Sequence, residues 1–180
     1  MPMMATSARF FIAPFLYFVL LNDSPSMRYI VAALFIVGSI TDWLDGFWAR
    51  KYNAASNMGK FMDPIADKVL VITALILLLY LRRVDPITPS IILARDIFIG
   101  GLRSVAAANG VVIDAKPTGK YKTALQMIAI PCMFIDLNIA GVEIARIGQW
   151  GLWVSTVLSI VSGVQYTVGY FSGAKKGKGL

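Results

Sequence analysis

Residues 30–46 read IVAALFIVGSITDWLDG, an apolar run that passes without interruption into two aspartates and a glycine. At 3.6 residues per turn, Asp42 and Asp45 lie on one face of a helix that continues from the apolar run. The same broad face continues with Gly46, Ala49 and Arg50. Small residues let a bulky ligand come close to the helix backbone. The stretch therefore predicts an apolar helix whose polar end carries carboxylates beside space for a ligand.

The rest of the 180-residue chain shows the same segmental hydrophobicity. It is 57% hydrophobic and 15% charged, with a mean hydropathy of +0.68, whereas soluble domains are about 45–50% apolar and about 25% charged. Apolar runs lie near 10–21, 29–41, 69–81, 87–102, 123–140 and 147–171. The shorter runs continue into flanks whose few charges can face a cavity or the interface. We predict an all-α polytopic membrane protein with six transmembrane helices in one domain, residues 1–180. A soluble bundle would need polar faces that these helices lack.

The positive charges predict the orientation of the chain. With both termini in the cytoplasm, twelve lysines and arginines fall on the cytoplasmic side and four fall outside, with Arg95 inside the fourth helix. This distribution satisfies the positive-inside bias of short loops. Lys175, Lys176 and Lys178 near the C-terminus are expected to contact anionic lipid. Nucleic-acid binding is not expected, because no exposed basic face with base-reading groups is visible.

Two further aspartates complete a carboxylate cluster. Asp63 and Asp67, four residues apart, share a face of the next helix, and Pro64 suits the first turn of that helix. Two antiparallel helices can then present Asp42, Asp45, Asp63 and Asp67 to one point. One or two Mg²⁺ or Mn²⁺ ions, which prefer oxygen ligands, would relieve the repulsion among these carboxylates. The alternative is that the aspartates are helix caps and solvated interface charges.

The absence of histidine narrows the chemistry. Without histidine, His-based nucleophiles, His general bases and most zinc sites are excluded. The single cysteine, Cys132, lies in an apolar run and is expected to be a buried packing residue. Any catalysis must therefore come from carboxylates, Lys, Arg, hydroxyl groups and metal ions.

The spacing of these residues resembles the signature of the CDP-alcohol phosphotransferase family. The matching positions are Asp42, Asp45, Gly46, Ala49, Arg50, Gly59, Asp63 and Asp67. The resemblance implies six transmembrane helices around a cytoplasm-facing polar cavity. It also implies transfer of a phosphatidyl group from a CDP-linked lipid, CDP-diacylglycerol, to an alcohol, with release of CMP.

By the same resemblance, Asp42, Asp45 and Asp63 bind metal, and Asp67 either ligates it or deprotonates the attacking hydroxyl. The nucleotide site would be lined by Gly46, Ala49, Arg50 and Gly59. Near the N-terminus, Thr6 and Arg9 match a further family pattern, whereas Met3 stands where relatives often have asparagine. A homodimer is also expected, by resemblance alone, and a bacterial inner membrane is the expected location.

A second group of charges predicts where the acceptor alcohol binds. Arg95 and Arg103 are eight residues apart, about two helical turns, and lie close to one face of the fourth helix. Arg103, Lys120 and Lys122, with Arg95, can form a cationic pocket for a phosphate-bearing acceptor. The alternative is that Arg95 pairs with Asp96 or Asp136 and that the lysines only satisfy the positive-inside bias.

The residues around Asp42, Arg95 and Lys120 more loosely resemble the phosphatidylglycerophosphate synthases, a branch of that family. This implies sn-glycerol 3-phosphate as the acceptor. Inositol phosphate, phosphatidylglycerol and serine remain alternatives, and serine fits less well because it needs no second phosphate pocket. From other classes, a divalent-cation transporter would need acidic breaks near mid-membrane, and a purely structural membrane subunit would leave the aspartates unexplained.

Overall fold

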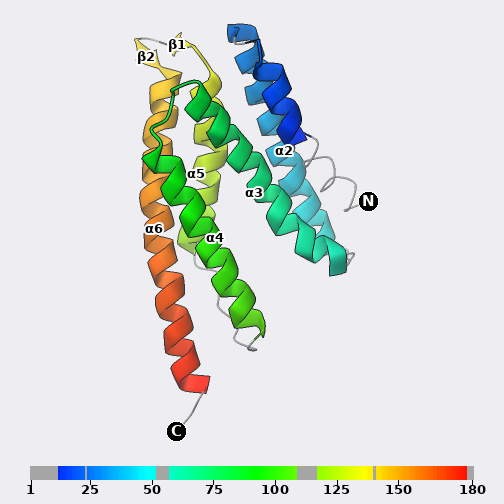
Figure 1. The fold of residues 1–180 in the computed structure, drawn as a ribbon, viewed down its shortest axis with the longest axis vertical. Helices are drawn as coiled ribbons and strands as arrows, with labels where there is room; N and C mark the ends of the chain where they lie inside the picture. Colours follow the sequence, from blue (N-terminus) through cyan, green and yellow to red (C-terminus); the bar gives the residue numbers. More distant parts are fainter. Residues whose placement is uncertain (1–11, 23, 52–56, 109–116, 140, 178–180) are drawn as a thin grey trace.

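The computed structural model describes the backbone of residues 12–22, 24–51, 57–108, 117–139 and 141–177, with side chains described at 12–22, 24–41, 44, 68–106, 108, 118–139 and 141–171. Residues 12–20 are helical. They are followed by α2 (Pro25–Lys51), α3 (Asn57–Tyr80), α4 (Ile87–Ala108), α5 (Pro117–Phe134), β1 (Asn138–Ile139), β2 (Val142–Glu143) and α6 (Ile144–Gly177). The described residues thus form six helices and one short hairpin (Figure 1), which confirms the all-α class.

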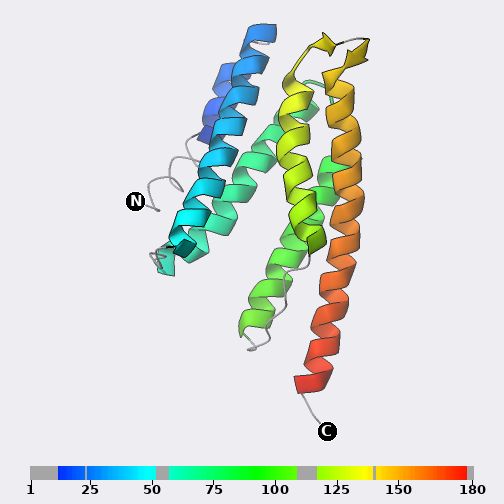
Figure 2. The same ribbon diagram turned by 180° about the vertical axis from the view of Figure 1, so that it is seen from behind.

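Consecutive helices run in opposite directions (Figure 1). We call the end at which α2 ends and α3 begins the aspartate end, and the opposite end, which carries β1 and β2, the hairpin end. The hairpin joins α5 to α6, and these two helices lie side by side in both views (Figures 1 and 2). The end of α4 and the start of α5 also lie toward the aspartate end. Segments far apart in the sequence are therefore gathered at one end of the bundle.

Local sequence explains where two of the helices begin. Ser24 caps α2, since its hydroxyl accepts a hydrogen bond from the N–H of Met27 at 3.3 Å, and Pro25 occupies the first helical position. Before α4, the Asp85 carboxylate accepts bonds from the N–H and the hydroxyl of Thr88 at 2.9 and 2.7 Å. Both caps lie at the hairpin end.

Two expectations about element boundaries are wrong. Pro64 is not in the first turn of its helix, because α3 begins seven residues earlier at Asn57. The apolar run 123–140 is not one continuous helix, because α5 ends at Phe134 and the chain then forms the hairpin. Gly141, at φ +83°, supplies the turn that a residue with a side chain rarely adopts. Hydrophobicity alone does not separate a helix end from an apolar hairpin.

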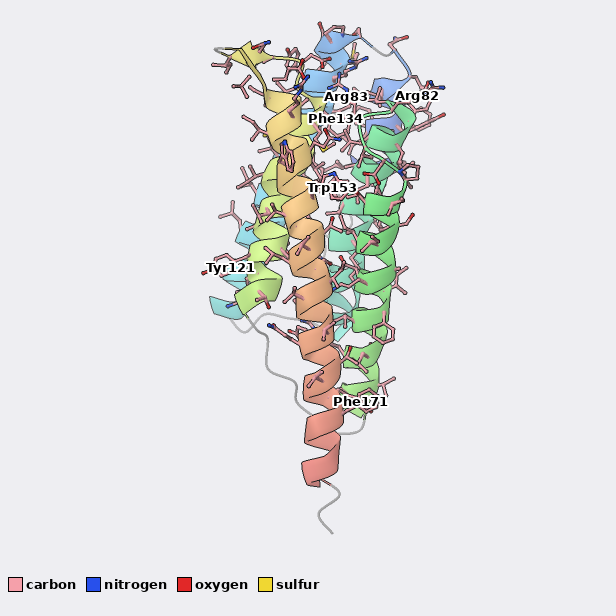
Figure 3. The ribbon with its side chains drawn as sticks, turned by 90° about the vertical axis from the view of Figure 1, so that its left-hand side faces the viewer. Arg82, Arg83, Tyr121, Phe134, Trp153 and Phe171 are labelled. Atoms are coloured by element: carbon pink, nitrogen blue, oxygen red, sulfur yellow. The ribbon has the colours of Figure 1, made fainter. Side chains whose placement is uncertain are left out.

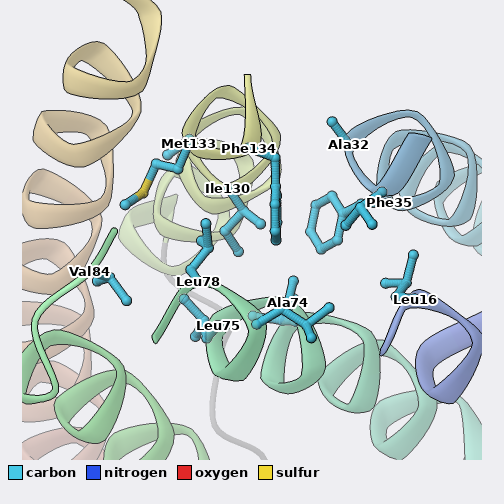
Figure 4. Close-up of a cluster of buried hydrophobic side chains, with 14 of the residues drawn as sticks. Leu16, Ala32, Phe35, Ala74, Leu75, Leu78, Val84, Ile130, Met133 and Phe134 are labelled. Carbon is cyan, nitrogen blue, oxygen red and sulfur yellow. The ribbon is translucent and has the colours of Figure 1, made fainter. Parts of the chain in front are cut away.

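The apolar core lies between α2, α3, α5 and the helix at 12–20. Phe35 and Phe134 face one another across it, and Leu16, Ala74 and Ile130 fill the space around them (Figure 4). Each of these five side chains is buried. This packing holds α3 against α2 and α5. It lies between the four aspartates and the hairpin end.

Helix α6 has polar residues inside and apolar residues outside. Ser155, Ser159 and Ser162 are fully buried, whereas Trp150 is 73% exposed and Phe171 60% exposed. An apolar exterior over a polar interior is the distribution expected of a helix in lipid. By length and composition, Ile144–Phe171 is the one stretch among the described residues that is long and apolar enough to cross a membrane. Pro25–Thr41 and Lys68–Tyr80 are shorter apolar stretches.

The end of α3 offers a test of backbone strain. Arg82 has a φ of 55°, and its N–H donates to the carbonyl of Leu79 while the N–H of Arg83 donates to that of Leu78, at 3.0 and 2.9 Å. This is a Schellman ending, whose left-handed position favours glycine. A side chain there costs about 1 kcal/mol, so Arg82→Gly is expected to raise the midpoint of thermal unfolding in detergent by a few degrees.

The neighbouring substitution Arg83→Gly is the control. It removes a guanidinium that binds the Met133 carbonyl at 2.7 Å and the Asp136 carboxylate, so it is expected to lower the same midpoint. A lower midpoint for Arg82→Gly would contradict the strain argument.

Candidate active site

The backbone brings the four aspartate positions to one end of the bundle. Asp42 and Asp45 lie on the last turns of α2, and Asp63 and Asp67 lie on the first half of α3. The two helices run antiparallel, and the chain between them is short (Figure 1). The prediction that each pair shares one helix is therefore confirmed at the level of the backbone. The side chains of Asp42, Asp45, Gly46, Ala49, Arg50, Gly59, Asp63 and Asp67 lie outside the described ones, as does the whole of Thr6, so their roles stay predictions.

Lys68, the residue after Asp67, is the first described side chain of α3, and it links this helix to α4. Its ammonium donates a hydrogen bond to the backbone carbonyl of Asp96 at 3.0 Å. The lysine passes over Gly100, where an added Cβ would lie 2.9 Å from the Lys68 Nζ. A larger residue at 100 would therefore displace the ammonium. The segment of α3 that carries Asp67 is thus tied directly to the helix that carries Asp96.

Asp96 is the centre of a partly buried charge cluster. Its Oδ1 accepts a hydrogen bond from Nη1 of Arg95 at 3.0 Å and another from Nζ of Lys122 on α5. The Lys122 side chain is only 4% exposed, that of Arg95 16% and that of Asp96 19%. Two cations bind the carboxylate and Lys68 binds the backbone carbonyl of the same residue, so the cluster keeps a net positive charge that suits an anionic ligand.

Arg95 also binds α6. Its Nε donates to the carbonyl of Ser159 at 2.9 Å, and its Nη2 donates to the hydroxyl of Ser162. On α5, the carbonyl of Lys122 accepts a bond from the hydroxyl of Ser155 at 3.1 Å. The cluster therefore joins α3, α4, α5 and α6. Of the two carboxylates considered as partners of Arg95, it is Asp96 that pairs with it.

Two buried polar atoms near this cluster have no hydrogen-bond partner among the described residues. They are Nε2 of Gln126, one turn from Lys122 on α5, and Oγ of Ser159, whose carbonyl holds Arg95. Both residues are at most 2% exposed. Buried polar groups are normally satisfied, so these atoms are available to a polar molecule in the interior of the bundle.

The other two predicted acceptor residues lie nearer the end of the bundle. Arg103, two turns beyond Arg95 on α4, is exposed; its guanidinium lies 4.5 Å from the ring centroid of Tyr166 and donates to that hydroxyl. Lys120 is exposed on α5. Tyr121, the next residue, points away from the bundle (Figure 3), whereas Lys122 is buried. The structure thus brings Arg95 and Lys122 together and leaves Arg103 and Lys120 at the surface.

Sequence reasoning missed several residues of this cluster. Lys68 was not placed with the acceptor residues, yet it binds the backbone of α4 at Asp96. Tyr166 and the buried serines of α6 carry no charge and lie in a long apolar run, so nothing in composition marked them. A serine every three or four residues, at 155, 159 and 162, was the available signal, since that spacing places all three on one helix face.

A separate ion-pair group closes the hairpin end. The Asp136 carboxylate accepts bonds from Arg28 on α2, at 2.6 Å, and from Arg83 after α3. Figure 3 shows Arg82, Arg83 and Phe134 together at this end. Burial raises the pKa of Asp136, but the two arginines outweigh this effect and hold the pKa below its ordinary value. Asp136 thus pins the end of α5 to α2 and to the α3–α4 loop.

This pairing gives a pH-dependent contribution to stability. A carboxyl with a lowered pKa in the folded state stabilises the fold above its unfolded pKa of about 3.9, and the contribution disappears as the pH falls through the folded pKa. Because the Asp136 carboxylate is 39% exposed, water screens the pairs, and we expect a contribution of about 1 kcal/mol. Between pH 7 and pH 3, the midpoint of thermal unfolding should fall less for Asp136→Asn than for the unsubstituted protein. An equal fall would contradict the assignment.

Comparison with known sequences identifies related proteins. A sequence model described as CDP-alcohol phosphatidyltransferase matches residues 1–161. A Rickettsia bellii protein named CDP-diacylglycerol–glycerol-3-phosphate 3-phosphatidyltransferase is 37% identical over 167 residues, 92% of each chain. Proteins of the same name from Bacillus subtilis and Haemophilus influenzae are 39% and 36% identical; these matches cover 75% and 92% of this chain and 70% and 90% of the relatives.

Proposed function

The chain belongs to the CDP-alcohol phosphatidyltransferase family, and on that premise we propose that it transfers the phosphatidyl group of CDP-diacylglycerol to sn-glycerol 3-phosphate. The products are phosphatidylglycerol phosphate and CMP. The observation that supports the proposal is that the four signature aspartates lie on two antiparallel helices, and that Lys68 joins one of these helices to a partly buried, positively charged cluster. The names of the relatives support the choice of both substrates.

The donor set fits hard divalent cations. Asp42, Asp45, Asp63 and Asp67 offer only carboxylate oxygens, and the chain has no histidine to favour zinc. We propose that these residues hold Mg²⁺ or Mn²⁺, as two ions. When bound, such ions polarise the diphosphate of the CDP-lipid and stabilise the attacking and leaving oxygens. Gly46, Ala49, Arg50, Gly59 and Thr6 are proposed to line the nucleotide site, with Arg50 on phosphate.

Asp67 and Lys68 have separate roles in the proposed reaction. Asp67, where it acts as base rather than as ligand, accepts the proton of the acceptor hydroxyl. The hydroxyl oxygen forms a bond to the phosphorus of the phosphatidyl group, and the bond from that phosphorus to the oxygen of CMP breaks, with CMP taking the electron pair. Lys68 holds α3 against α4 beside Asp67, which keeps the base and the acceptor site in fixed relation.

The cation cluster is proposed to bind the phosphate of the acceptor. Lys122 provides a buried charge and Arg95 a partly buried one, and Arg103 and Lys120 attract the phosphate from the surface. The free donors of Gln126 and Ser159 suit the polar interior that such an acceptor needs. An acceptor without phosphate, such as serine, would leave these charges unused.

The surrounding architecture is proposed from the sequence and the exposed apolar surface. Six helices cross a bacterial inner membrane around a polar cavity that opens to the cytoplasm, with both termini and the aspartate end on the cytoplasmic side. The hairpin end, which carries Arg28, Arg82, Arg83 and Arg146, faces outward. The polar interior of α6 and its apolar exterior support this arrangement. A homodimer rests on family resemblance.

The test is an assay of CMP release by the purified protein in detergent. CDP-diacylglycerol and Mg²⁺ are supplied with glycerol 3-phosphate, inositol phosphate, serine or phosphatidylglycerol in separate reactions. We expect release with glycerol 3-phosphate alone. Release with another acceptor would keep the chemistry and overturn the substrate. No release with any acceptor, together with no binding of CDP or metal, would overturn the enzyme assignment.

A further inference from the structure

Asp96 is in contact with all three cations of the charge cluster. One carboxylate oxygen, Oδ1, accepts from both Arg95 and Lys122, and the backbone carbonyl of the same residue accepts from Lys68. These donors come from α4, α5 and α3 in turn. Asp96 is thus the point at which α3, through Lys68, meets Arg95 and the buried Lys122.

Because Lys122 is buried, the position of its ammonium depends on Asp96. The Lys122 side chain is 4% exposed, so its ammonium has no bulk water to solvate it and depends on Asp96 for its position. Lysine has a flexible four-carbon stem and is a point charge rather than a rigid fork. Without a fixed partner its ammonium would move among several positions, and a phosphate would have to bear the cost of ordering it.

We propose that Asp96 is a positioning residue of the acceptor site, which fixes the Lys122 ammonium and the Arg95 guanidinium where the phosphate of the acceptor binds. The inference rests on the proposed function and deepens it. Asp96 acts only through the cations. The contact between its carbonyl and Lys68 keeps the fixed cations in register with the segment of α3 that carries Asp67.

A carboxylate beside a phosphate site can repel the phosphate or can hold nearby cations in place. These two effects change the KM for the acceptor in opposite directions. If Asp96 only balances charge, it repels the acceptor phosphate, and its removal should lower the KM for glycerol 3-phosphate. If Asp96 positions the cations, its removal should raise that KM. If it only supports the fold, activity should fall without a selective change in either KM.

The experiment compares Asp96→Asn with Asp136→Asn in the full-length protein in detergent. Both substitutions remove a carboxylate that binds two cations, but Asp136 lies at the hairpin end. For Asp96→Asn we expect the KM for glycerol 3-phosphate to rise about tenfold, the KM for CDP-diacylglycerol to stay the same and kcat to change less than about threefold. For Asp136→Asn we expect both KM values to stay the same.

Two further variants sharpen the result. Asp96→Glu keeps the negative charge that the cations need but displaces the carboxylate, so it is the variant to measure where Asp96→Asn does not fold, and it should raise the KM for glycerol 3-phosphate about threefold. In a Lys122→Met background, Asp96→Asn should raise that KM by less than it does in the unsubstituted protein, since part of its action passes through Lys122.

An unchanged or lowered KM for glycerol 3-phosphate in both Asp96 variants would overturn the inference. So would a fall in kcat with no change in KM, or full additivity with Lys122→Met. These outcomes presuppose that the unsubstituted protein releases CMP with glycerol 3-phosphate. If it does not, the proposed function itself fails, and the inference fails with it.

Discussion

Asp67→Asn is expected to lower glycerol-3-phosphate-dependent CMP release by about 1000-fold or more. A positioned base contributes about 10²–10⁴-fold to a rate, and a metal ligand contributes at least as much where the metal bears the developing charge. The amide neither accepts a proton at neutral pH nor binds a hard cation as strongly. The measurement is CMP release at saturating CDP-diacylglycerol, acceptor and Mg²⁺.

The control for this variant is Asp85→Asn. Asp85 caps α4 at the hairpin end through Thr88, and asparagine caps helices about as well as aspartate. We expect it to retain activity within about twofold, because it lies far from the aspartate end. Activity of Asp67→Asn above a tenth of the unsubstituted level would contradict the assignment. Partial recovery of Asp67→Asn in excess Mn²⁺ would favour a role as ligand, and no recovery would favour a role as base.

The order and type of the helices could be predicted from the sequence because each apolar run is separated from the next by polar residues. The helices extend beyond those runs, since α2 continues through Asp42 and Asp45 to Lys51 and α3 begins at Asn57. Hydropathy marks only the apolar part of a helix, whereas backbone hydrogen bonding continues into the polar part. The error after Phe134 has the opposite cause, since the apolar run 123–140 continues past the end of α5 into the hairpin, and hydropathy does not separate the two.

The charge cluster could be predicted only in outline. Arg95 and Lys122 were chosen for the same pocket, and they do meet, but they meet on the carboxylate of Asp96. Sequence spacing shows which residues share a helix face, but not which faces of different helices come together. The contact between Lys68 and the carbonyl of Asp96 depends on the approach of α3 to α4 at Gly100, and a backbone acceptor leaves no mark in the sequence.

Removal of divalent cations is expected to stop CMP release completely. Four carboxylates gathered without metal would repel one another, and the diphosphate of the CDP-lipid would add to that repulsion. Addition of Mg²⁺ or Mn²⁺ after chelation should restore activity, whereas Ca²⁺, which takes more ligands at longer distances, should restore little. Activity that survives exhaustive chelation would contradict the metal site.

Substitution of one aspartate of α2 at a time tests the metal site through the Mg²⁺ concentration that activity requires. Asp42→Asn or Asp45→Asn should raise the Mg²⁺ concentration for half-maximal activity by at least about tenfold, since a neutral amide oxygen is a weaker ligand than a carboxylate. Glu143→Gln is the matched control, because Glu143 is an exposed carboxylate at the hairpin end that pairs with Arg146, and its Mg²⁺ requirement should not change. If all three variants needed the same Mg²⁺ concentration, the ions would bind elsewhere, for example on the diphosphate alone. If only the two α2 variants needed more, the protein would contribute ligands directly. The antiparallel pairing of α2 with α3 would then be the reason that carboxylates from two helices serve one reaction.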